Sequence, residues 1–180
     1  MSVLSPRTLF EFIGTNEVVR GLSERELASP EGAGFDLRLD FASQVVDDAF
    51  LGVTTRYTGE AERLAPREDG EAPHYMLYPG DYVLLTTKEE VDLPENMVGF
   101  LWPRTTMFRS GAVLSTGVIA PGYRGVLTVG CLAAGRTSLR IEVGARFVHL
   151  VIMGLDQAGY MYRGQWQNGR VYTPEPENQV

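Results

Sequence analysis

The sequence has very few of the residues on which several common classes of protein depend. Its 180 residues include one cysteine, Cys131, which excludes an internal disulfide framework and a zinc site built from clustered cysteines. The two histidines are too few for a convincing metal cage, and their spacing gives no Ser-His-Asp triad. No apolar run approaches the ~20 residues of a membrane-spanning helix, and the first residues lack the pattern of a secretory signal. We therefore expect a cytoplasmic protein that does not contact a membrane.

Lysine is also nearly absent, since Lys88 is the only one, and the basic residues are otherwise arginines. A GC-rich genome explains this bias better than a special role for arginine. The formal net charge of −7 argues against a general nucleic-acid binder, which needs a basic surface to neutralise phosphates. It leaves room for a small anionic ligand held by a few arginines. The length fits a single domain, residues 1–180, with its own hydrophobic core.

Two short helices are expected in an N-terminal helical segment, residues 1–30. Ser5 suits the N-cap of the first helix and Pro6 its first position, and Gly14 suits its end. The apolar residues that share one face of this helix are Leu9, Phe10 and Ile13. Ser23 and Glu26 have the spacing of a capping box, which predicts a second helix over 23–27.

From residue 35 onward, short strands alternate with turns. Residues 35–41 alternate apolar and polar side chains, which is typical of a half-buried strand. The later strands are expected at 75–78, 82–86, 97–102, 113–119, 126–129 and 147–153. The charged segment 58–73 is expected to be an exposed loop or ribbon, and 173–180 a flexible arm. Many short strands at this spacing predict an all-β sandwich or barrel with small helical additions.

One charged turn follows the strand that ends near residue 102. A hydroxyl residue there suits the cap of a single helical turn, and Gly111 suits its end. Arg104 and Arg109 supply cations from opposite ends of the turn, and Thr105 and Thr106 add hydroxyl donors, a mixture that suits a triphosphate. Local physics alone favours the simpler alternative of a capped turn with two solvated arginines.

A second turn lies at residues 119–123. Pro121 presets φ and Gly122 supplies a left-handed position, which predicts a tight turn. Tyr123 directly after it can stack against a sugar or a base. Taken alone, this turn is only a hairpin connection.

The order and spacing of these motifs resemble the dCTP deaminase and dUTPase superfamily over almost the whole chain. The stretches that carry the resemblance are 34–39, 78–84, 91–99, 104–109, 116–125, 143–150 and 162–167. Arg104-Thr105-Thr106 stands in for the family's Arg-Ser-Ser motif, and Arg109 follows at the family's spacing. The stretch 143–150 resembles a late strand usually written with Gly-Gln-Leu, and 162–167 resembles a C-terminal segment that closes over phosphates.

The resemblance implies a distorted, jelly-roll-like β-barrel of the dUTPase type with short N-terminal helices. It also implies a homotrimer with sites at the subunit boundaries, where a deoxypyrimidine nucleoside triphosphate binds with Mg²⁺. The implied phosphate-binding residues are Arg104, Thr105, Thr106, Arg109, Tyr162 and Gln165. The implied base and sugar pocket consists of Gly117, Tyr123, Val129 and Gly130. Asp36 is either structural or helps to organise a magnesium-bound triphosphate, and residues 160–180 form the phosphate-closing arm.

The chain departs from the family at both catalytic positions. Deaminases carry a glutamate that shuttles protons where this chain has Gly130, and hydrolytic members carry an aspartate where it has Ala120. A positioned acid or base contributes about 10²–10⁴-fold, so either loss is serious. His149 is the obvious candidate for a substitute base, although a histidine in such an apolar run is more often a packed strand residue. Gly130 and Gly117 together also leave open a larger pocket for a modified pyrimidine.

Three functions remain open at this point. The first is hydrolysis of dUTP to dUMP and pyrophosphate with a non-standard base, since phosphate hydrolysis depends heavily on positioning and metal electrostatics. Deamination of dCTP is the least favoured family activity, because Gly130 replaces the expected glutamate. The second is a catalytically inactive, nucleotide-binding or regulatory homologue, and the third is a purely structural protein. The retained arginines and hydroxyls favour the first two.

Overall fold

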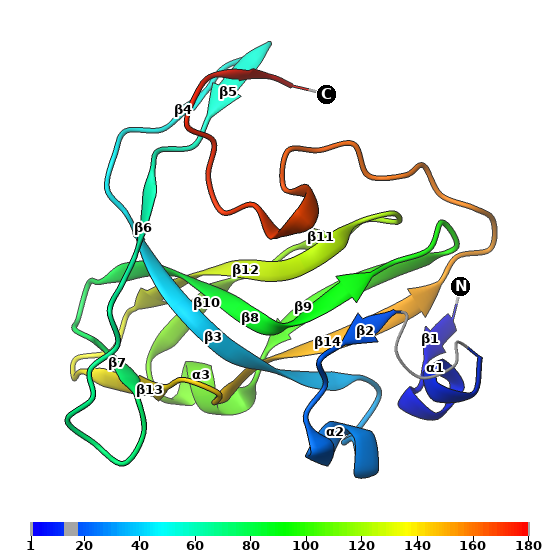
Figure 1. Cartoon of the computed structure of the whole chain (residues 1–180), viewed down its shortest axis with the longest axis horizontal. Helices are drawn as coiled ribbons and strands as arrows, with labels where there is room; N and C mark the ends of the chain where they lie inside the picture. Colours follow the sequence, from blue (N-terminus) through cyan, green and yellow to red (C-terminus); the bar gives the residue numbers. More distant parts are fainter. Residues whose placement is uncertain (1, 13–17, 180) are drawn as a thin grey trace.

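The computed structural model describes residues 2–12 and 18–179 (Figure 1). The helices are α1 (Pro6–Phe12), α2 (Glu24–Ala28), α3 (Thr105–Arg109) and the 3₁₀ turn η1 (Gln167–Gly169). The strands of the first half are β1 (Ser2–Leu4), β2 (Val19–Arg20), β3 (Phe35–Val45), β4 (Phe50–Leu51), β5 (Thr55–Tyr57), β6 (Ala61–Arg63), β7 (His74–Leu77) and β8 (Tyr82–Asp92). Those of the second half are β9 (Met97–Pro103), β10 (Ala112–Ser115), β11 (Val118–Ile119), β12 (Arg124–Ala133), β13 (Leu139–Glu142), β14 (Arg146–Gly154) and β15 (Glu177–Asn178).

Most of these strands form one curled antiparallel sheet. Its order is β10-β12-β8-β3-β14-β9-β11, with β1 on β14, β2 on β8 and β6 on β3. Two smaller sheets pair β13 with β7, and β15 with β5 and β4. The curled sheet makes a half-barrel (Figure 1), which agrees with the predicted all-β barrel with short N-terminal helices.

The core lies inside the curl of this sheet. Along β3, Phe35, Leu37 and Leu39 are all buried, as the alternation of residues 35–41 predicts. The strand is longer than predicted and runs on to Val45, because its second half pairs with β8 and β6. A strand of this length spans both the core and the upper edge of the half-barrel, so it links the two parts of the molecule that carry the predicted site residues.

Both predicted N-terminal helices are present. Ser5 Oγ accepts a hydrogen bond from the Thr8 amide at 3.2 Å, and Ser23 Oγ accepts one from the Glu26 amide at 3.3 Å. Only half of the capping box forms, because the Glu26 carboxylate turns away and accepts the amide of Asp36 instead, at 3.1 Å. Positions 13 and 14 of the predicted first helix lie outside the described residues. No helix in the described ranges is long and apolar enough to cross a membrane.

The prediction of one strand over 113–119 is wrong. The segment forms two strands, β10 and β11, on either side of Thr116 and Gly117. β10 pairs with β12, whereas β11 pairs with β9 at the other end of the sheet order. A continuous strand cannot pair with both neighbours, so the chain breaks at the glycine and changes partner.

The prediction of a flexible arm over 173–180 is wrong for the described residues, 173–179. Thr173 is fully buried, its hydroxyl accepts the amide of Thr58 at 2.8 Å, and Glu177 pairs with Arg56 across β15 and β5. Segment 58–73 forms a ribbon, since β6 pairs with β3 and Arg67 bridges to His74. Backbone pairing with distant segments orders both regions despite their polar composition.

The charged turn after β9 is helical, as predicted, but its cap differs from the prediction. The residue before α3 is Arg104, and no side chain caps the helix. Gly111 follows the end of the helix with φ of +84°, a backbone conformation that favours glycine. Thr105 and Thr106 therefore keep their hydroxyls free of a capping role, and both residues are exposed.

Candidate functional site

A cavity of about 470 Å³ opens on one face of strands β8 and β12. The C-terminal arm (residues 160–179) and the segment 45–59 border it opposite this face. Aromatic side chains contribute much of the wall, and they are Tyr82, Tyr123, Tyr162 and Trp166. Arg170 is the one charged residue that lines the cavity within the described part of the chain, and no carboxylate does. The cavity therefore suits a flat, mostly uncharged group with a few polar atoms.

The tight turn at Pro121 and Gly122 forms part of the cavity rim. Gly122 has φ of +77°, as predicted, and the Tyr123 amide donates to Ala120 O at 3.1 Å. The Tyr123 hydroxyl donates to Val126 O at 2.6 Å, and burial raises the pKa of Tyr123 to about 12. The ring is thereby fixed as part of the cavity wall.

The arm is attached to this turn. The Gln167 side chain accepts the amide of Arg124 at 2.9 Å and donates to Gly122 O at 2.8 Å. The rings of Tyr162 and Tyr123 meet edge to face, with centroids 5.5 Å apart. The arm thus packs over the cavity of its own chain.

Neither position at which the family carries its catalytic acids supplies a polar side chain to the cavity. Ala120 lines it, and Gly130 lies on β12, diagonally opposite Tyr82 of β8. A Cβ atom built at Gly130 would overlap the Tyr82 hydroxyl and lie 2.9 Å from Cζ of that ring. The space beside Gly130 is therefore filled by Tyr82, and the idea that this glycine enlarges the pocket is wrong. The space beside Gly117 is open, since no atom lies within 4 Å of a Cβ built there.

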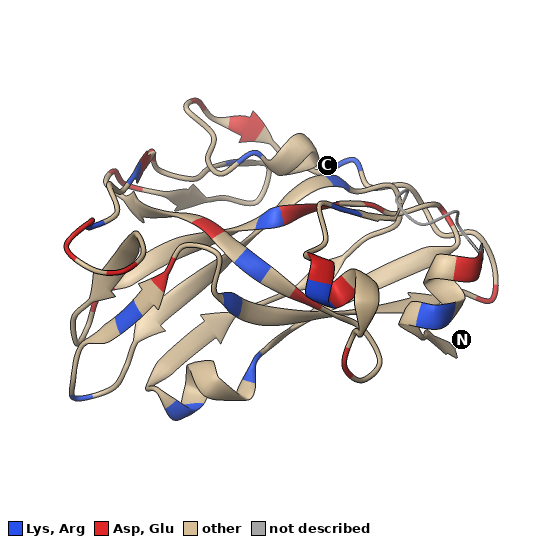
Figure 2. Ribbon diagram, turned by 60° about the horizontal axis from the view of Figure 1, so that its bottom comes forward, with Lys and Arg blue, Asp and Glu red and all other residues tan. Residues whose placement is uncertain are grey.

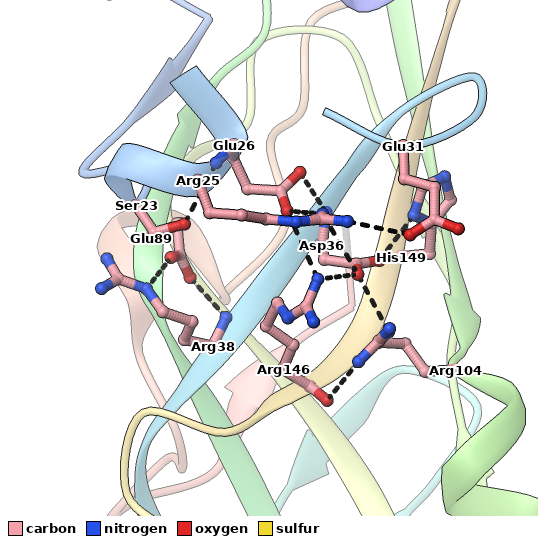
Figure 3. Close-up of polar contacts among 10 residues, drawn as sticks. All are labelled: Ser23, Arg25, Glu26, Glu31, Asp36, Arg38, Glu89, Arg104, Arg146 and His149. Carbon is pink, nitrogen blue, oxygen red and sulfur yellow. Dashed lines mark hydrogen bonds and ion pairs between the residues drawn. The ribbon is translucent and has the colours of Figure 1, made fainter. Parts of the chain in front are cut away.

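The second group of candidate residues forms a charged cluster on the opposite side of the molecule. We call it the Asp36 cluster; its members are Glu26, Asp36, Arg104, Arg146 and His149 (Figure 3). Asp36 Oδ2 contacts Arg104 Nε at 2.9 Å and Arg146 Nη1 at 3.0 Å, and Oδ1 contacts His149 Nδ1 at 2.8 Å. Glu26, which is fully buried, accepts the Asp36 amide and pairs with Arg25. Long-range strand pairing assembles this cluster, because His149 of β14 lies directly opposite Asp36 of β3.

The electrostatics of this cluster keep Asp36 ionised. Burial opposes the charge, but the hydrogen bond from His149 and the positive charges of Arg104 and Arg146 outweigh it and lower the pKa of Asp36. Both carboxylate oxygens are already occupied by cationic or donor groups, an arrangement that does not fit a ligand for Mg²⁺. Within the described ranges, no group of three or more His, Cys, Asp or Glu side chains is arranged to hold a metal ion. Asp36 therefore has a structural role, in which it fixes the positions of Arg104 and Arg146.

His149 lies in the Asp36 cluster and does not line the cavity. Its Nδ1 faces the Asp36 carboxylate, and a quarter of its side chain, 25%, is exposed. The other histidine, His74, is buried at the start of β7, where its Nε2 lies 3.4 Å from Asp69. Neither histidine reaches the place of Ala120 or Gly130.

The six predicted phosphate-binding residues do not come together within one subunit. Arg104 belongs to the Asp36 cluster, and Thr105, Thr106 and Arg109 are exposed on α3, on the far side of the half-barrel from the arm (Figure 1). Tyr162 lines the cavity, and Gln165 accepts a hydrogen bond from Arg56. Of the four predicted base and sugar residues, Gly117, Tyr123 and Val129 line the cavity, and Gly130 adjoins it through Tyr82.

Several residues of both regions escaped the sequence analysis. Tyr82, Trp166 and Arg170 line the cavity, and Glu26 and Arg146 complete the Asp36 cluster. Their contacts depend on strand register and on where the arm folds back, and neither can be predicted from neighbouring residues in the sequence. Charges of both signs also lie close together elsewhere on the surface (Figure 2), so charge pattern alone does not mark the cluster.

Comparison with known proteins identifies the family of this chain. A family model described as dCTP deaminase-like matches residues 13–155. A probable deoxyuridine 5'-triphosphate nucleotidohydrolase of Aeropyrum pernix is 32% identical over 154 residues, which are 83% of this chain and 90% of the relative. A dCTP deaminase of Pyrobaculum islandicum is 31% identical over 104 residues, 58% of either chain.

Among solved structures, the 2'-deoxycytidine 5'-triphosphate deaminase from Agrobacterium tumefaciens superposes with a TM-score of 0.64 at 14% identity. The match covers 86% of this chain and 49% of that one, so this chain spans about half the length of that deaminase. The likeness extends over the curled sheet and thus confirms the fold. The family match over residues 13–155 and the 32% identity to the Aeropyrum relative show that this chain belongs to the dCTP deaminase-like family.

Proposed function

We propose that this protein binds a deoxypyrimidine nucleoside triphosphate, with the base and the sugar in the cavity beside the Pro121-Gly122 turn. The observation that carries the proposal is the cavity itself, because Gly117, Tyr123 and Val129 converge on it from separate strands and turns. Its aromatic walls and its volume of about 470 Å³ suit a flat heterocycle with a sugar attached.

The phosphates would be held by α3 of a second copy in a homotrimer. Thr105, Thr106 and Arg109 combine exposed hydroxyls with a forked cation, the donors that a triphosphate needs. Arg104 would act mainly by orienting this turn, since its Nε is engaged by Asp36 and its Nη1 lies 3.5 Å from Arg146 O. The separation of α3 from the cavity within one subunit supports a site shared between subunits. Magnesium would enter with the triphosphate, held by phosphate oxygens.

Turnover by the family's deaminase route is disfavoured, because no carboxylate of the described residues lines the cavity and Gly130 offers no proton shuttle. Hydrolysis of dUTP to dUMP and pyrophosphate is the second candidate function. It is favoured by the Aeropyrum relative, which this chain covers almost completely. Ala120 cannot activate water, so hydrolysis requires a base from another copy or a solvent route. Binding without turnover is the alternative, and it makes the protein a regulatory or storage homologue.

A product screen tests the proposal. The full-length protein is incubated with Mg²⁺ and a panel of pyrimidine and purine triphosphates, and mass spectrometry then measures both products and nucleotide retained by the protein. We expect retention of deoxypyrimidine triphosphates over purine ones. Appearance of dUMP would establish the hydrolase, and formation of dUTP from dCTP would show the deaminase that we disfavour. If the protein neither retains nor converts any pyrimidine nucleotide, the proposal is overturned.

Replacement of Ala120 by aspartate tests whether turnover is limited by the missing general base or by the pocket. Because Ala120 lines the cavity, Ala120→Asp places a carboxylate at its edge and should raise dUTP hydrolysis well above that of the parent. The control is Ala120→Asn, which is matched in size but cannot accept a proton. Equal rates for both variants would show that the missing acid is not what limits turnover.

A further inference from the structure

Tyr82 occupies an unusual place in the cavity. It is the first residue of β8 and pairs with Leu132, while Gly130 pairs with Leu84 two positions away. The Tyr82 ring therefore crosses diagonally to Gly130, and its hydroxyl lies where a side chain at position 130 would begin. Tyr82 also lines the cavity, and 48% of it is exposed. Only a glycine at position 130 leaves the phenol room to lie there.

Most other hydroxyls of the cavity wall are already used within the protein. The Tyr123 hydroxyl donates to Val126 O, and the Tyr162 hydroxyl accepts the Trp166 amide at 3.1 Å. Thr128 Oγ1 and Thr86 Oγ1 share a hydrogen bond of 3.0 Å. Over the described residues, by contrast, no protein group forms a hydrogen bond with the Tyr82 hydroxyl. It keeps both its donor and its acceptor capacity for a ligand.

We propose that the Tyr82 hydroxyl, which lies beside Gly130, forms a hydrogen bond with a polar group of the bound pyrimidine ring. The inference rests on the proposed function, since it names the residue that reads the base in the proposed pocket. Tyr82 is then a base-binding residue. A phenol can satisfy a ring carbonyl or an exocyclic amino group without moving, whereas an apolar wall would leave that group unpaired.

Replacement of Tyr82 by phenylalanine removes only the hydroxyl. Calorimetric titration with dUTP and dCTP should show affinity about 3- to 10-fold lower for Tyr82→Phe, the effect of one neutral hydrogen bond. Titration with inorganic triphosphate, which has no base, should show no change. The matched control is Tyr78→Phe, since Tyr78 is equally exposed at 49%, accepts a hydrogen bond from Arg67 and does not line the cavity. If the ring serves only to cover the glycine, Tyr82→Phe will bind both nucleotides like the parent, and the inference fails.

A second pair of variants tests the same contact from the other strand. In Gly130→Ala the new methyl group must push the Tyr82 hydroxyl aside, so nucleotide affinity should fall by a similar factor. In a Tyr82→Leu background the methyl group has no hydroxyl to displace, and Gly130→Ala should then cause little further loss. Equal losses in both backgrounds would show that Gly130 acts independently of Tyr82 and would overturn the inference.

Binding by the parent protein distinguishes failure of the proposed function from failure of the role given to Tyr82. If the parent binds no pyrimidine triphosphate, the proposed function fails and the inference with it. If the parent binds dUTP or dCTP and Tyr82→Phe binds them equally well, only the role of Tyr82 fails. Thermal unfolding of each variant confirms that affinity is compared between folded proteins.

Discussion

The Asp36 cluster and the cavity form two chemically opposite regions of one half-barrel. The cluster concentrates carboxylates, arginines and a histidine around β3 and β14, whereas the cavity has aromatic walls and, among the described residues, one charged lining residue, Arg170. Each region carries part of the predicted site: Arg104 and α3 lie with the cluster, and Gly117, Tyr123 and Tyr162 lie with the cavity. The contrast teaches that this chain keeps its densest ion pairing apart from its aromatic cavity.

The two regions also differ in how freely their polar groups are available. In the cluster, Asp36 has three close partners and a fourth, Arg25, at 3.8 Å, and Glu26 is buried and paired. In the cavity, the Tyr82 hydroxyl is free of protein partners among the described residues. The cluster is therefore suited to hold α3 in place, and the cavity is suited to receive a ligand.

The largest expected effect comes from removal of the carboxylate at the centre of the cluster. Asp36→Ala leaves Arg104 partly buried without its counterion and Arg146 with only the longer contact to Glu26, at 3.8 Å. The free energy of unfolding should therefore fall by about 3 kcal/mol. Urea denaturation measures the loss. The control is Glu142→Ala, which breaks an exposed pair with Arg140 and should change stability by less than about 0.5 kcal/mol. Similar losses for both variants would show that the cluster is no more than surface charge.

Acid should weaken the same cluster. The pKa of Asp36 is lowered in the folded protein, below its ordinary value of 3.8, so folding favours the ionised form. The stability it contributes is complete above about pH 4 and is lost as pH falls through the lower, folded-state value. Urea denaturation at about pH 5 and about pH 3 should show a smaller loss on acidification in Asp36→Asn than in the parent. Identical losses would show that Asp36 is not a source of the acid sensitivity.

An intermediate effect is expected at α3. Arg109→Ala should weaken dUTP binding about 10- to 100-fold, because a charged hydrogen bond to phosphate is lost, while stability stays unchanged since Arg109 is exposed. Arg136→Ala is the control, since Arg136 is an exposed arginine in the turn between β12 and β13. Calorimetric titration measures both. Unchanged affinity in Arg109→Ala would remove α3 from the phosphate site.

The smallest effect is expected in the cavity wall at alkaline pH. Burial raises the pKa of Tyr123 to about 12 from an ordinary value of 10.0, so folding favours the neutral phenol. Its contribution to stability is complete below about pH 10 and falls by about 1 kcal/mol by about pH 11. Absorbance titration of the tyrosinates should show a late component that disappears in Tyr123→Phe. If that component persists in the variant, Tyr123 is not the buried phenol of the cavity.

Local signals in the sequence predict the elements but not their partners. The Ser23 cap, the Gly122 turn and the alternation of β3 each depend on residues close in sequence, and all three are confirmed. The split of 113–119 into two strands depends on pairing with β12 and β9, which are distant in sequence. Gly117 is the one local signal of a break between the two strands.

The same limit applies to the site. The residues of the 116–125 motif do line the cavity, because the turn itself shapes it. The approach of Tyr82 to Gly130 depends on the register of β8 with β12, and Gln165 meets Arg56 only where the arm folds back. The ion pairs of Asp36 link it to β14, more than a hundred residues away, and to Arg104 before α3, over sixty residues away, so no spacing rule reveals them.

Mixed oligomers test most directly whether the two regions meet between subunits. Arg109→Ala lacks the phosphate cation, and Gly117→Trp fills the open space at the cavity with a large side chain. Each variant alone should bind dUTP at least about 10-fold more weakly than the parent. Oligomers assembled from both should recover tight binding, because the cavity of one subunit then meets the intact α3 of the other. Recovery in the mixture supports a shared site. Absence of binding in verified mixed oligomers would contradict it and place the whole site within one subunit.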